Sequence, residues 1–329
     1  MTDIRWGILG CGDVCEVKSG PAFNKVAGSR LVAVMRRDGA KAADYARRHG
    51  VPRSYDDAAR LIADDEVNAV YIATPPGNHC ELALAVAEAG KACYVEKPMA
   101  RTAAECLRMC EAFERRGLPL FVAYYRRRLP GFVAAKRAID AGRLGTITHV
   151  DYRMTRLHRP DPDGQWRMDL ATAGAGLVLD LGSHTMDAID SMLGPVENVH
   201  GVAFNHSANG VEDACCMSFS IGKAIGTASW NFAGCVKEDV ITITGTAGRI
   251  VMPTFGQEPV RLVTADGEET FDATYPKHVQ QPLIETVVGE LLGRDGVTCP
   301  STGRSALRTN RVLDEMLVGF YGDRSRLFA

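Results

Sequence analysis

The 329-residue sequence has little of what marks secreted, membrane-spanning or nucleic-acid-binding proteins. Its 38 Lys and Arg residues and 40 Asp and Glu residues give a net charge of -2, which leaves no basic surplus to attract nucleic acid or an anionic membrane. Charged residues interrupt every apolar stretch well before the length that crosses a bilayer. The first residues lack the basic and apolar regions of a signal peptide. We therefore expect a soluble, cytoplasmic protein whose partner is neither a nucleic acid nor a membrane.

The sequence also has no C-x-x-C pair, although it contains 10 cysteines. The one adjacent pair, Cys215-Cys216, falls in an apolar run typical of a strand. Cysteines scattered in this way favour reduced, mostly buried thiols over a disulfide framework or a zinc site. Internal repeats and low-complexity tracts are absent as well, and 46% hydrophobic with 24% charged residues is an ordinary globular composition. A chain of this length is expected to form two domains.

Residues 1–125 alternate short apolar runs with helical patterns. The apolar runs predict strands over residues 4–9, 31–35, 69–73, 92–95 and 120–123. The helical patterns between them include residues 39–49, 78–89 and 102–116. Such alternation is typical of a parallel sheet with helices on both faces. We therefore predict an α/β domain with a parallel sheet over residues 1–125.

The rhythm changes after about residue 145. Strand-like runs with short connections cover residues 147–157, 196–204, 214–221, 224–232 and 240–244. The dipeptide Gly222-Lys223 between two of these runs predicts a tight hairpin. We predict a second, α+β domain over residues 126–329 with a largely antiparallel sheet and one helix ahead of it. Another helix, over residues 305–320, could pack back on the first domain.

A glycine-rich segment, Gly-Ile-Leu-Gly-Cys-Gly at residues 7–12, follows the first predicted strand and opens a helix. Gly10 permits the tight turn, and Gly12 lets the backbone approach a pyrophosphate at the helix N-terminus. The third position of this dinucleotide-binding pattern holds Cys15, which is small but is neither Gly nor Ala. The alternative is a strand-to-helix turn that binds nothing. The residues assigned to the cofactor here are Gly10, Gly12, Asp13 and Val14.

Two arginines follow the second predicted strand, where an acidic residue would hydrogen-bond the adenosine ribose of NAD. Arg36 and Arg37 could instead bind a 2′-phosphate through their planar guanidinium groups. Asp38 comes next and could serve the ribose, and a solvated loop is the alternative for Arg36 and Arg37. We expect NADP as the preferred cofactor, with NAD as the other possibility.

The segments after the third and fourth strands should reach the same carboxyl edge of the sheet, where ligands bind. Thr74, Pro75 and His79 follow the third strand and are assigned to the cofactor, His79 as a local hydrogen-bonding group. Glu96 and Lys97 follow the fourth.

Lys97 could donate a hydrogen bond to a reacting oxygen, with its backbone held extended by Pro98. Glu96 could bond a ribose hydroxyl or hold the lysine. Read without its context, this segment is a surface Glu-Lys pair before a proline turn.

Residues 177–193 predict a helix with an unusual polar face. At 100° per residue, one arc carries Asp180, Ser183, His184, Asp187, Asp190 and Ser191. Asp180 and His184 are an i, i+4 pair, so the carboxylate could orient the imidazole for general acid-base catalysis. The alternative is a structural histidine at a domain junction. We expect no metal site, because one histidine and two acids on one helix are too few ligands, and no G-x-S-x-G nucleophile is present.

The combined motifs resemble one family. They are Gly7 to Gly12, Thr74-Pro75-Pro76 with His79, Glu96-Lys97-Pro98, Tyr125-Arg126-Arg127, Trp166-Arg167-Met168-Asp169, Gly174-Ala175-Gly176 and Asp180-Leu181-Gly182-Ser183-His184. The sequence is similar over nearly its whole length to the Gfo/Idh/MocA oxidoreductases, which include glucose–fructose oxidoreductase, inositol dehydrogenase and dihydrodiol dehydrogenase. Glu-Lys-Pro followed at a distance by Asp-x-Gly-x-His is specific to that family, whereas the glycine pattern is not.

The resemblance implies a Rossmann domain and an α+β domain whose open, mostly antiparallel sheet often mediates homodimers or homotetramers. It implies that Lys97, Asp180 and His184 line the catalytic site. Lys97 or His184 would exchange a hydroxyl proton while hydride moves between the substrate carbon and nicotinamide C4. Tyr125 stands where many relatives have Asn, and Ala175 replaces a glycine, so the resemblance does not fix the substrate.

We therefore expect an NAD(P)-dependent oxidoreductase whose small-molecule substrate is a sugar, polyol or cyclic diol. Position alone suggests that Tyr125, Arg153, Trp166 and Arg167 contact it. A reductase of a non-sugar carbonyl or a tetrapyrrole is one alternative. A non-catalytic dinucleotide-sensing protein is another, although it would have no need of Lys97 and His184.

Overall fold

A computed structural model describes residues 3–157, 166–207 and 210–328, and its contacts divide the chain into two compact units. Unit 1 comprises the chain up to residue 100 with residues 104–125 and 276–307, and unit 2 comprises residues 101–103, 126–275 and 308 onward. The break after Tyr125 coincides with the predicted domain boundary. Residues 276–307, which the sequence analysis assigned to the second domain, instead belong to unit 1. They do so because Ser301 exchanges hydrogen bonds with Val122 at the edge of the first sheet.

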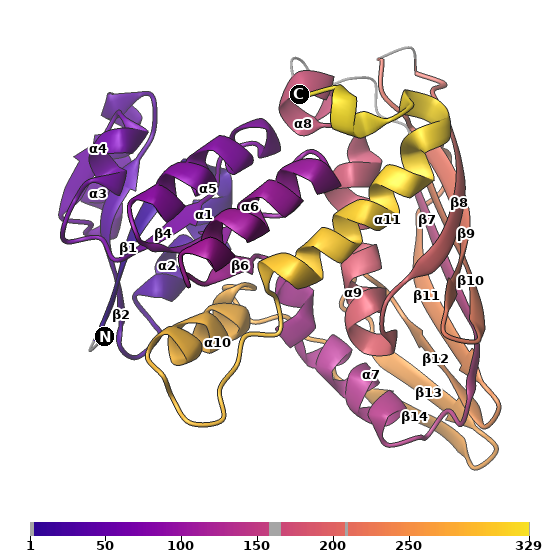
Figure 1. Ribbon diagram of the computed structural model, residues 1–329. Helices are drawn as coiled ribbons and strands as arrows, with labels where there is room; N and C mark the ends of the chain where they lie inside the picture. Colours follow the sequence, from indigo (N-terminus) through magenta and orange to yellow (C-terminus); the bar gives the residue numbers. More distant parts are fainter. Residues whose placement is uncertain (1–2, 158–165, 208–209, 329) are drawn as a thin grey trace. The chain divides into compact units, whose positions relative to one another are not determined.

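Unit 1 is built on a six-stranded parallel sheet (Figure 1). Its strands are β1 (Ile4–Leu9), β2 (Ser29–Met35), β3 (Arg53–Tyr55), β4 (Ala69–Ile72), β5 (Ala92–Val95) and β6 (Leu120–Val122). The order β3-β2-β1-β4-β5-β6 reverses direction between β1 and β4, which is the Rossmann arrangement and opens a crevice at the carboxyl ends of those strands. Every residue of β4 and β5 is buried, as expected for a sheet covered on both faces.

Proline, capping and glycine residues set several of the helix ends in unit 1. They are α1 (Asp13–Val17), α2 (Gly20–Phe23), α3 (Gly39–His49), α4 (Ala58–Ile62), α5 (His79–Glu88), α6 (Ala103–Arg115) and α10 (Gln281–Leu291). The helix predicted after the glycine segment is broken into α1 and α2, because Pro21 has no N–H and its ring would clash with a continued helix. The side chain of Asp38 caps α3 by accepting from the Lys41 N–H, and Gly50 ends the helix at φ 66°.

An aromatic cluster fills the centre of unit 1 and carries a carboxylate at its end. Trp6 packs on Phe23 at 4.8 Å between ring centroids, and Tyr71 stacks on Tyr94 at 5.1 Å. The Tyr71 hydroxyl donates to Glu96 Oε1 at 2.5 Å. The core of the sheet thereby fixes the segment that follows β5.

Unit 2 is built on an eight-stranded, mostly antiparallel sheet, in which β7 and β10 pair in parallel and the other described pairs are antiparallel. Its strands are β7 (Ile147–Leu157), β8 (Glu197–Phe204), β9 (Ala214–Ile221), β10 (Ala224–Gly234), β11 (Glu238–Gly245), β12 (Gly248–Met252), β13 (Val260–Thr264) and β14 (Gly267–Phe271). The predicted hairpin is confirmed, since Ile221 pairs with Ala224 and Gly222 has φ 56°.

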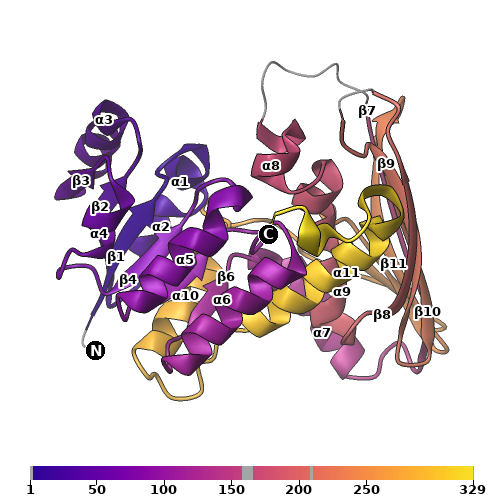
Figure 2. The same cartoon turned by 45° about the horizontal axis from the view of Figure 1, so that its top comes forward.

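One face of this sheet is covered by helices, and the other carries none in the described part of unit 2 (Figures 1 and 2). The helices are α7 (Pro130–Asp140), α8 (Leu170–Ala173), α9 (Ser183–Leu193) and the greater part of α11 (Gly303–Tyr321). Trp230 of β10 lies under Gly182, where an added Cβ would come within 3.3 Å of the indole. We call the face that carries Trp230 and α9 the inner face.

Two further expectations can be compared with the structure. Among the described residues, no helix is both long and apolar enough to span a membrane. Eight of the ten cysteines are buried, as predicted for most of them, and only Cys216 and Cys235 are exposed.

Candidate active site

The glycine segment forms an open loop after β1. Gly10 has φ 88°, and an added Cβ would lie 2.9 Å from Thr74 Cγ2, so only glycine fits there. At Gly12 the nearest atom to an added Cβ is 4.0 Å away, so the backbone is open to a ligand. Thr74 Oγ1 is buried beside this loop with no hydrogen-bond partner in the described chain. A cradle with exposed backbone and an unsatisfied hydroxyl fits a dinucleotide.

The third position of the pattern keeps its packing role. Cys15 is fully buried, and its Sγ lies 3.8 Å from the carbonyl oxygen of Gly10. A small side chain here lets α1 sit close to the strand, as Gly or Ala would. Asp13 is exposed and Val14 is half-buried in the first turn of α1.

His79 uses both ring nitrogens for the protein backbone. Nε2 lies 2.7 Å from the carbonyl oxygen of Thr74, and Nδ1 lies 3.1 Å from that of Pro98. The ring is fully buried, and burial lowers its pKa. His79 therefore ties the segment after β4 to the segment after β5, and can serve a cofactor only by holding Thr74 and Pro75 in place.

The arginines after β2 are available to an anion. Arg36 is half-buried and Arg37 is exposed, and neither side chain forms an ion pair within the described residues. Burial raises the pKa of the Cys11 thiol to about 11, and the Arg36 guanidinium opposes that rise, so Arg36 lies near the glycine loop. The side chain of Asp38, in contrast, is engaged as the cap of α3.

Glu96 holds the backbone that carries Lys97. The Glu96 carboxylate is buried and accepts from Tyr71 Oη and Gln280 Nε2, both at 2.5 Å. Its other oxygen accepts from the Lys97 N–H at 3.1 Å. The Glu96 carboxylate thereby fixes the backbone at Lys97.

The segment predicted as one helix over residues 177–193 is a π-helical turn, Val178–Gly182, followed by α9. The projection at 100° per residue therefore fails before Ser183, because a π-turn closes its hydrogen bonds over five residues. Asp180 lies in that turn, and its Oδ2 accepts from Arg167 Nε at 3.1 Å. The close approach of Gly182 to Trp230, which a local pattern does not reveal, accompanies the departure from α-helix.

His184 lies in the first turn of α9 with 4% of its surface exposed. Its ring meets Phe255 edge to face, at 5.9 Å between centroids and an interplanar angle of 82°. Phe255 follows β12 in a loop, and no motif in the sequence marks it. The surroundings keep the imidazole away from bulk water, which suits a group that moves a proton to a bound substrate.

The remaining acids of α9 have structural roles. Asp187 accepts from Arg127 Nε at 2.9 Å and Nη2 at 2.7 Å, and Asp190 accepts from Arg308 at 2.9 and 2.7 Å. Burial raises the pKa of Asp187, and the Arg127 guanidinium opposes the rise. Only part of the predicted polar face therefore belongs to a candidate site, because these buried pairs fasten α9 to its neighbours.

The residues suggested as substrate contacts lie in three settings. Tyr125 is buried at the end of unit 1. The Arg167 guanidinium lies 4.4 Å from the Trp166 ring centroid and pairs with Asp180, so this pair stands beside a candidate catalytic residue.

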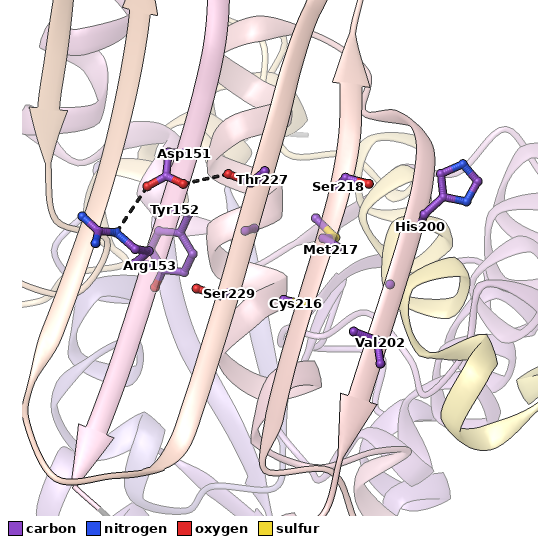
Figure 3. Close-up of a pocket in the computed structure, with 12 residues that line it drawn as sticks. Asp151, Tyr152, Arg153, His200, Val202, Cys216, Met217, Ser218, Thr227 and Ser229 are labelled. Carbon is purple, nitrogen blue, oxygen red and sulfur yellow. Dashed lines mark hydrogen bonds and ion pairs between the residues drawn. The ribbon is translucent and has the colours of Figure 1, made fainter.

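Arg153 points to the outer face of the sheet, away from α9. It pairs with Asp151 at 3.4 Å and Glu238 at 3.5 Å, and lines a shallow hollow on that face with Ser229 (Figure 3). Tyr152, its neighbour in β7, is buried on the inner face. Because successive side chains of a strand point to opposite faces, Arg153 is not retained in the proposed site.

A buried carboxylate that the sequence analysis missed holds the turn ahead of Asp180. Both Glu212 oxygens accept from the Gly176 N–H, at 3.0 and 2.9 Å, and Tyr321 Oη donates to the same carboxylate. Arg324, also buried, donates to the carbonyl oxygen of Gly174 at 2.8 Å. Two charged side chains therefore fix the two glycines of one turn.

Comparison with known proteins gives a consistent result. One family model, described as an oxidoreductase family with an NAD-binding Rossmann fold, matches residues 4–124, and the GFO/IDH/MocA C-terminal domain matches residues 132–251. Oxidoreductase P35 of Formosa agariphila is 35% identical over 300 residues, which cover 90% of this chain and 93% of that protein. The 1,5-anhydro-D-fructose reductase of Ensifer adhaerens is 29% identical, with 92% of this chain and 95% of that protein covered.

Solved structures agree with the fold. Levoglucosan dehydrogenase in complex with NADH matches with a TM-score of 0.84 over 96% of each chain, at 22% identity. The first family model covers most of unit 1, the second covers most of unit 2, and the structural match extends over both.

Proposed function

This chain belongs to the Gfo/Idh/MocA oxidoreductase family, and on that premise we propose that it oxidises or reduces a sugar, a polyol or a cyclic diol with NADP as preferred cofactor. The observation that carries the proposal is the pairing of an NAD-binding Rossmann unit with an intact Lys97 and a shielded His184. The names of its relatives, an anhydrofructose reductase and a levoglucosan dehydrogenase, support a sugar-like substrate.

The dinucleotide would be held by unit 1. Gly10 and Gly12 present open backbone to its pyrophosphate, and Thr74 offers its unsatisfied hydroxyl. Arg36 and Arg37 would bind the 2′-phosphate of NADP, since their guanidinium groups match phosphate geometry. When bound, the nicotinamide supplies a ring carbon, C4, that exchanges hydride with the substrate carbon.

The chain's own task is to handle the hydroxyl proton. Lys97 sits on a backbone that Glu96 fixes, and its ammonium would hydrogen-bond the reacting oxygen. His184 would exchange the proton as general acid or base, and Asp180, paired with Arg167, lies one turn before it. Trp166, Arg167 and Tyr125 are proposed to contact the substrate.

The test uses Lys97→Met and His184→Asn, with Lys136→Met and His200→Asn as exposed controls. Turnover is followed by nicotinamide absorbance on a panel of sugars, polyols and diols, and cofactor affinity by fluorescence titration. General acid-base groups typically contribute about 10²- to 10⁴-fold, so each variant should lose at least about 10²-fold in kcat while cofactor affinity stays nearly constant. The controls should keep full activity.

Two outcomes would count against the proposal. Full activity in either variant would remove that residue from the proton step. Tight dinucleotide binding by the wild type, with no turnover of any compound in the panel, would favour the dinucleotide-sensing alternative.

A further inference from the structure

Phe255 is held beside His184 by a half-buried hydrogen-bond network centred on Asp239. Asp239 Oδ2 accepts from the Phe255 N–H at 2.6 Å, and Oδ1 accepts from the Thr254 N–H at 3.1 Å. The same Oδ1 accepts from Tyr152 Oη at 3.1 Å. A carboxylate with three donors anchors this turn to the inner face of the sheet, so the ring of Phe255 forms a rigid wall next to His184.

Two guanidinium groups lie over that ring. The Cζ of Arg126 is 4.3 Å from the centroid of Phe255, and the Cζ of Arg156 is 5.5 Å away. Arg126 is 3% exposed, and its Nε donates to the carbonyl oxygen of Thr254 at 2.7 Å, so it belongs to the framework of the wall. Arg156 is exposed, and within the described ranges its side chain forms no ion pair and no hydrogen bond.

The position of Arg156 in β7 assigns it to the inner face. Tyr152 and Met154 are buried there, and Arg156 continues the same alternation at the end of the strand. Arg153, on the outer face, has two carboxylates within 3.5 Å. Arg156, on the same face as His184, therefore has no counter-ion among the described residues, whereas Arg153 has two.

We propose that Arg156 and Phe255 form a subsite for the anionic group of an acidic sugar, a carboxylate or a phosphate. The guanidinium fork matches the oxygens of either anion, and the substrate would supply the negative charge that the described residues do not place there. The inference rests on the proposed function, because it takes His184 as the group at the reacting hydroxyl. Oxidation would move hydride from the hydroxyl-bearing carbon to the nicotinamide and the hydroxyl proton to the protein, and would leave the acidic group unchanged.

The experiment measures binding, so that it does not depend on turnover. The full chain, saturated with whichever reduced nicotinamide cofactor it binds, is titrated calorimetrically with hexuronates, hexonates, hexose phosphates and the matching neutral hexoses. Wild type should bind at least one acid about tenfold or more tightly than its neutral counterpart. Arg156→Ala should weaken that acid about 10- to 100-fold and leave the neutral sugar within about twofold. Arg153→Ala, the matched control on the other face of β7, should change neither.

The arms separate the possible results. Preference for hexuronates or hexonates identifies the anion as a carboxylate, and preference for hexose phosphates identifies it as a phosphate. An acid preference that survives Arg156→Ala overturns the subsite, and so does a panel in which no acid binds better than its neutral counterpart. Failure of the proposed function is a different result, because the preferred acid would then bind as expected but would not be turned over.

Discussion

Replacing Arg36 tests the cofactor preference most directly. Its backbone N–H donates to the carbonyl oxygen of Tyr55 at 3.1 Å, which anchors the residue to β3, while its side chain makes no ion pair in the described chain. Charge-assisted hydrogen bonds contribute about 1.5–3 kcal/mol, so losing one to a 2′-phosphate should raise the Kd for NADPH about 10- to 150-fold. Because NADH has no 2′-phosphate, Arg36→Ala should change its Kd by less than about threefold.

The assay is a fluorescence titration of each cofactor into wild type, Arg36→Ala and a control, Arg47→Ala. Arg47 is an exposed arginine of α3 that already pairs with Asp44 at 2.6 Å, so the control removes an equal charge from the same region. It should leave both affinities unchanged. Equal or tighter binding of NADH by wild type, with no effect of Arg36→Ala, would refute the reasoning and transfer the ribose contact to Asp38.

Further predictions concern stability, pH and thiol reactivity. Arg127→Met should lower the free energy of unfolding by about 3–5 kcal/mol, because it leaves the buried Asp187 carboxylate without its ion-pair partner. Lys136→Met breaks an exposed ion pair and should lower it by about 0.5 kcal/mol or less. Urea unfolding compares the two variants, and equal losses would contradict the assignment. Burial raises the pKa of Glu212 above its ordinary 4.5, so the folded state binds that proton more readily than the unfolded state. Relative to Glu212→Gln, wild type should therefore lose stability as pH rises above about 4.5 through the folded pKa, and thermal unfolding across pH would exclude this if the difference stayed constant. A thiol reagent should label Cys216 and Cys235 rapidly in the native protein and the eight buried cysteines only after unfolding; mass spectrometry that finds a buried thiol labelled first would contradict the burial.

Local patterns were sufficient for much of the fold. The bounds of β1, β5, β7 and β9 coincide with the predicted strands, because apolar alternation and the turn residues around them are properties of neighbouring residues. The three-residue β3 was not predicted, since two of its residues are exposed and it is held only as an edge strand beside β2.

Long-range contacts account for what the sequence analysis did not predict. The assignment of residues 276–307 to unit 1 depends on bonds such as that from Gln280 to Glu96, which are 184 positions apart. The π-turn before α9 accompanies the packing of Gly182 on Trp230, and the periodicity of residues 177–193 carries no trace of that contact.

The candidate site residues also fall into those predictable from local motifs and those that depend on long-range contacts. Thr74, Lys97 and His184 are marked by motifs, whereas Phe255 is brought to His184 by Asp239 from another strand. The alternation of β7 predicts from sequence that Arg153 and Arg156 point to opposite faces of the sheet. Which of these is the inner face follows from the packing of the segment before α9 on Trp230.

The way in which the chain returns to each unit has a consequence for its synthesis. Unit 1 is completed by residues 276–307, and the turn at Gly174 in unit 2 accepts a hydrogen bond from Arg324. Domains that are continuous in sequence can fold one after another as they leave the ribosome. Here the first unit must wait for most of the second to be translated before residues 276–307 can join it. A ribosome stalled before residue 276 would therefore present the six-stranded sheet without α10, with the Glu96 carboxylate still lacking its partner Gln280.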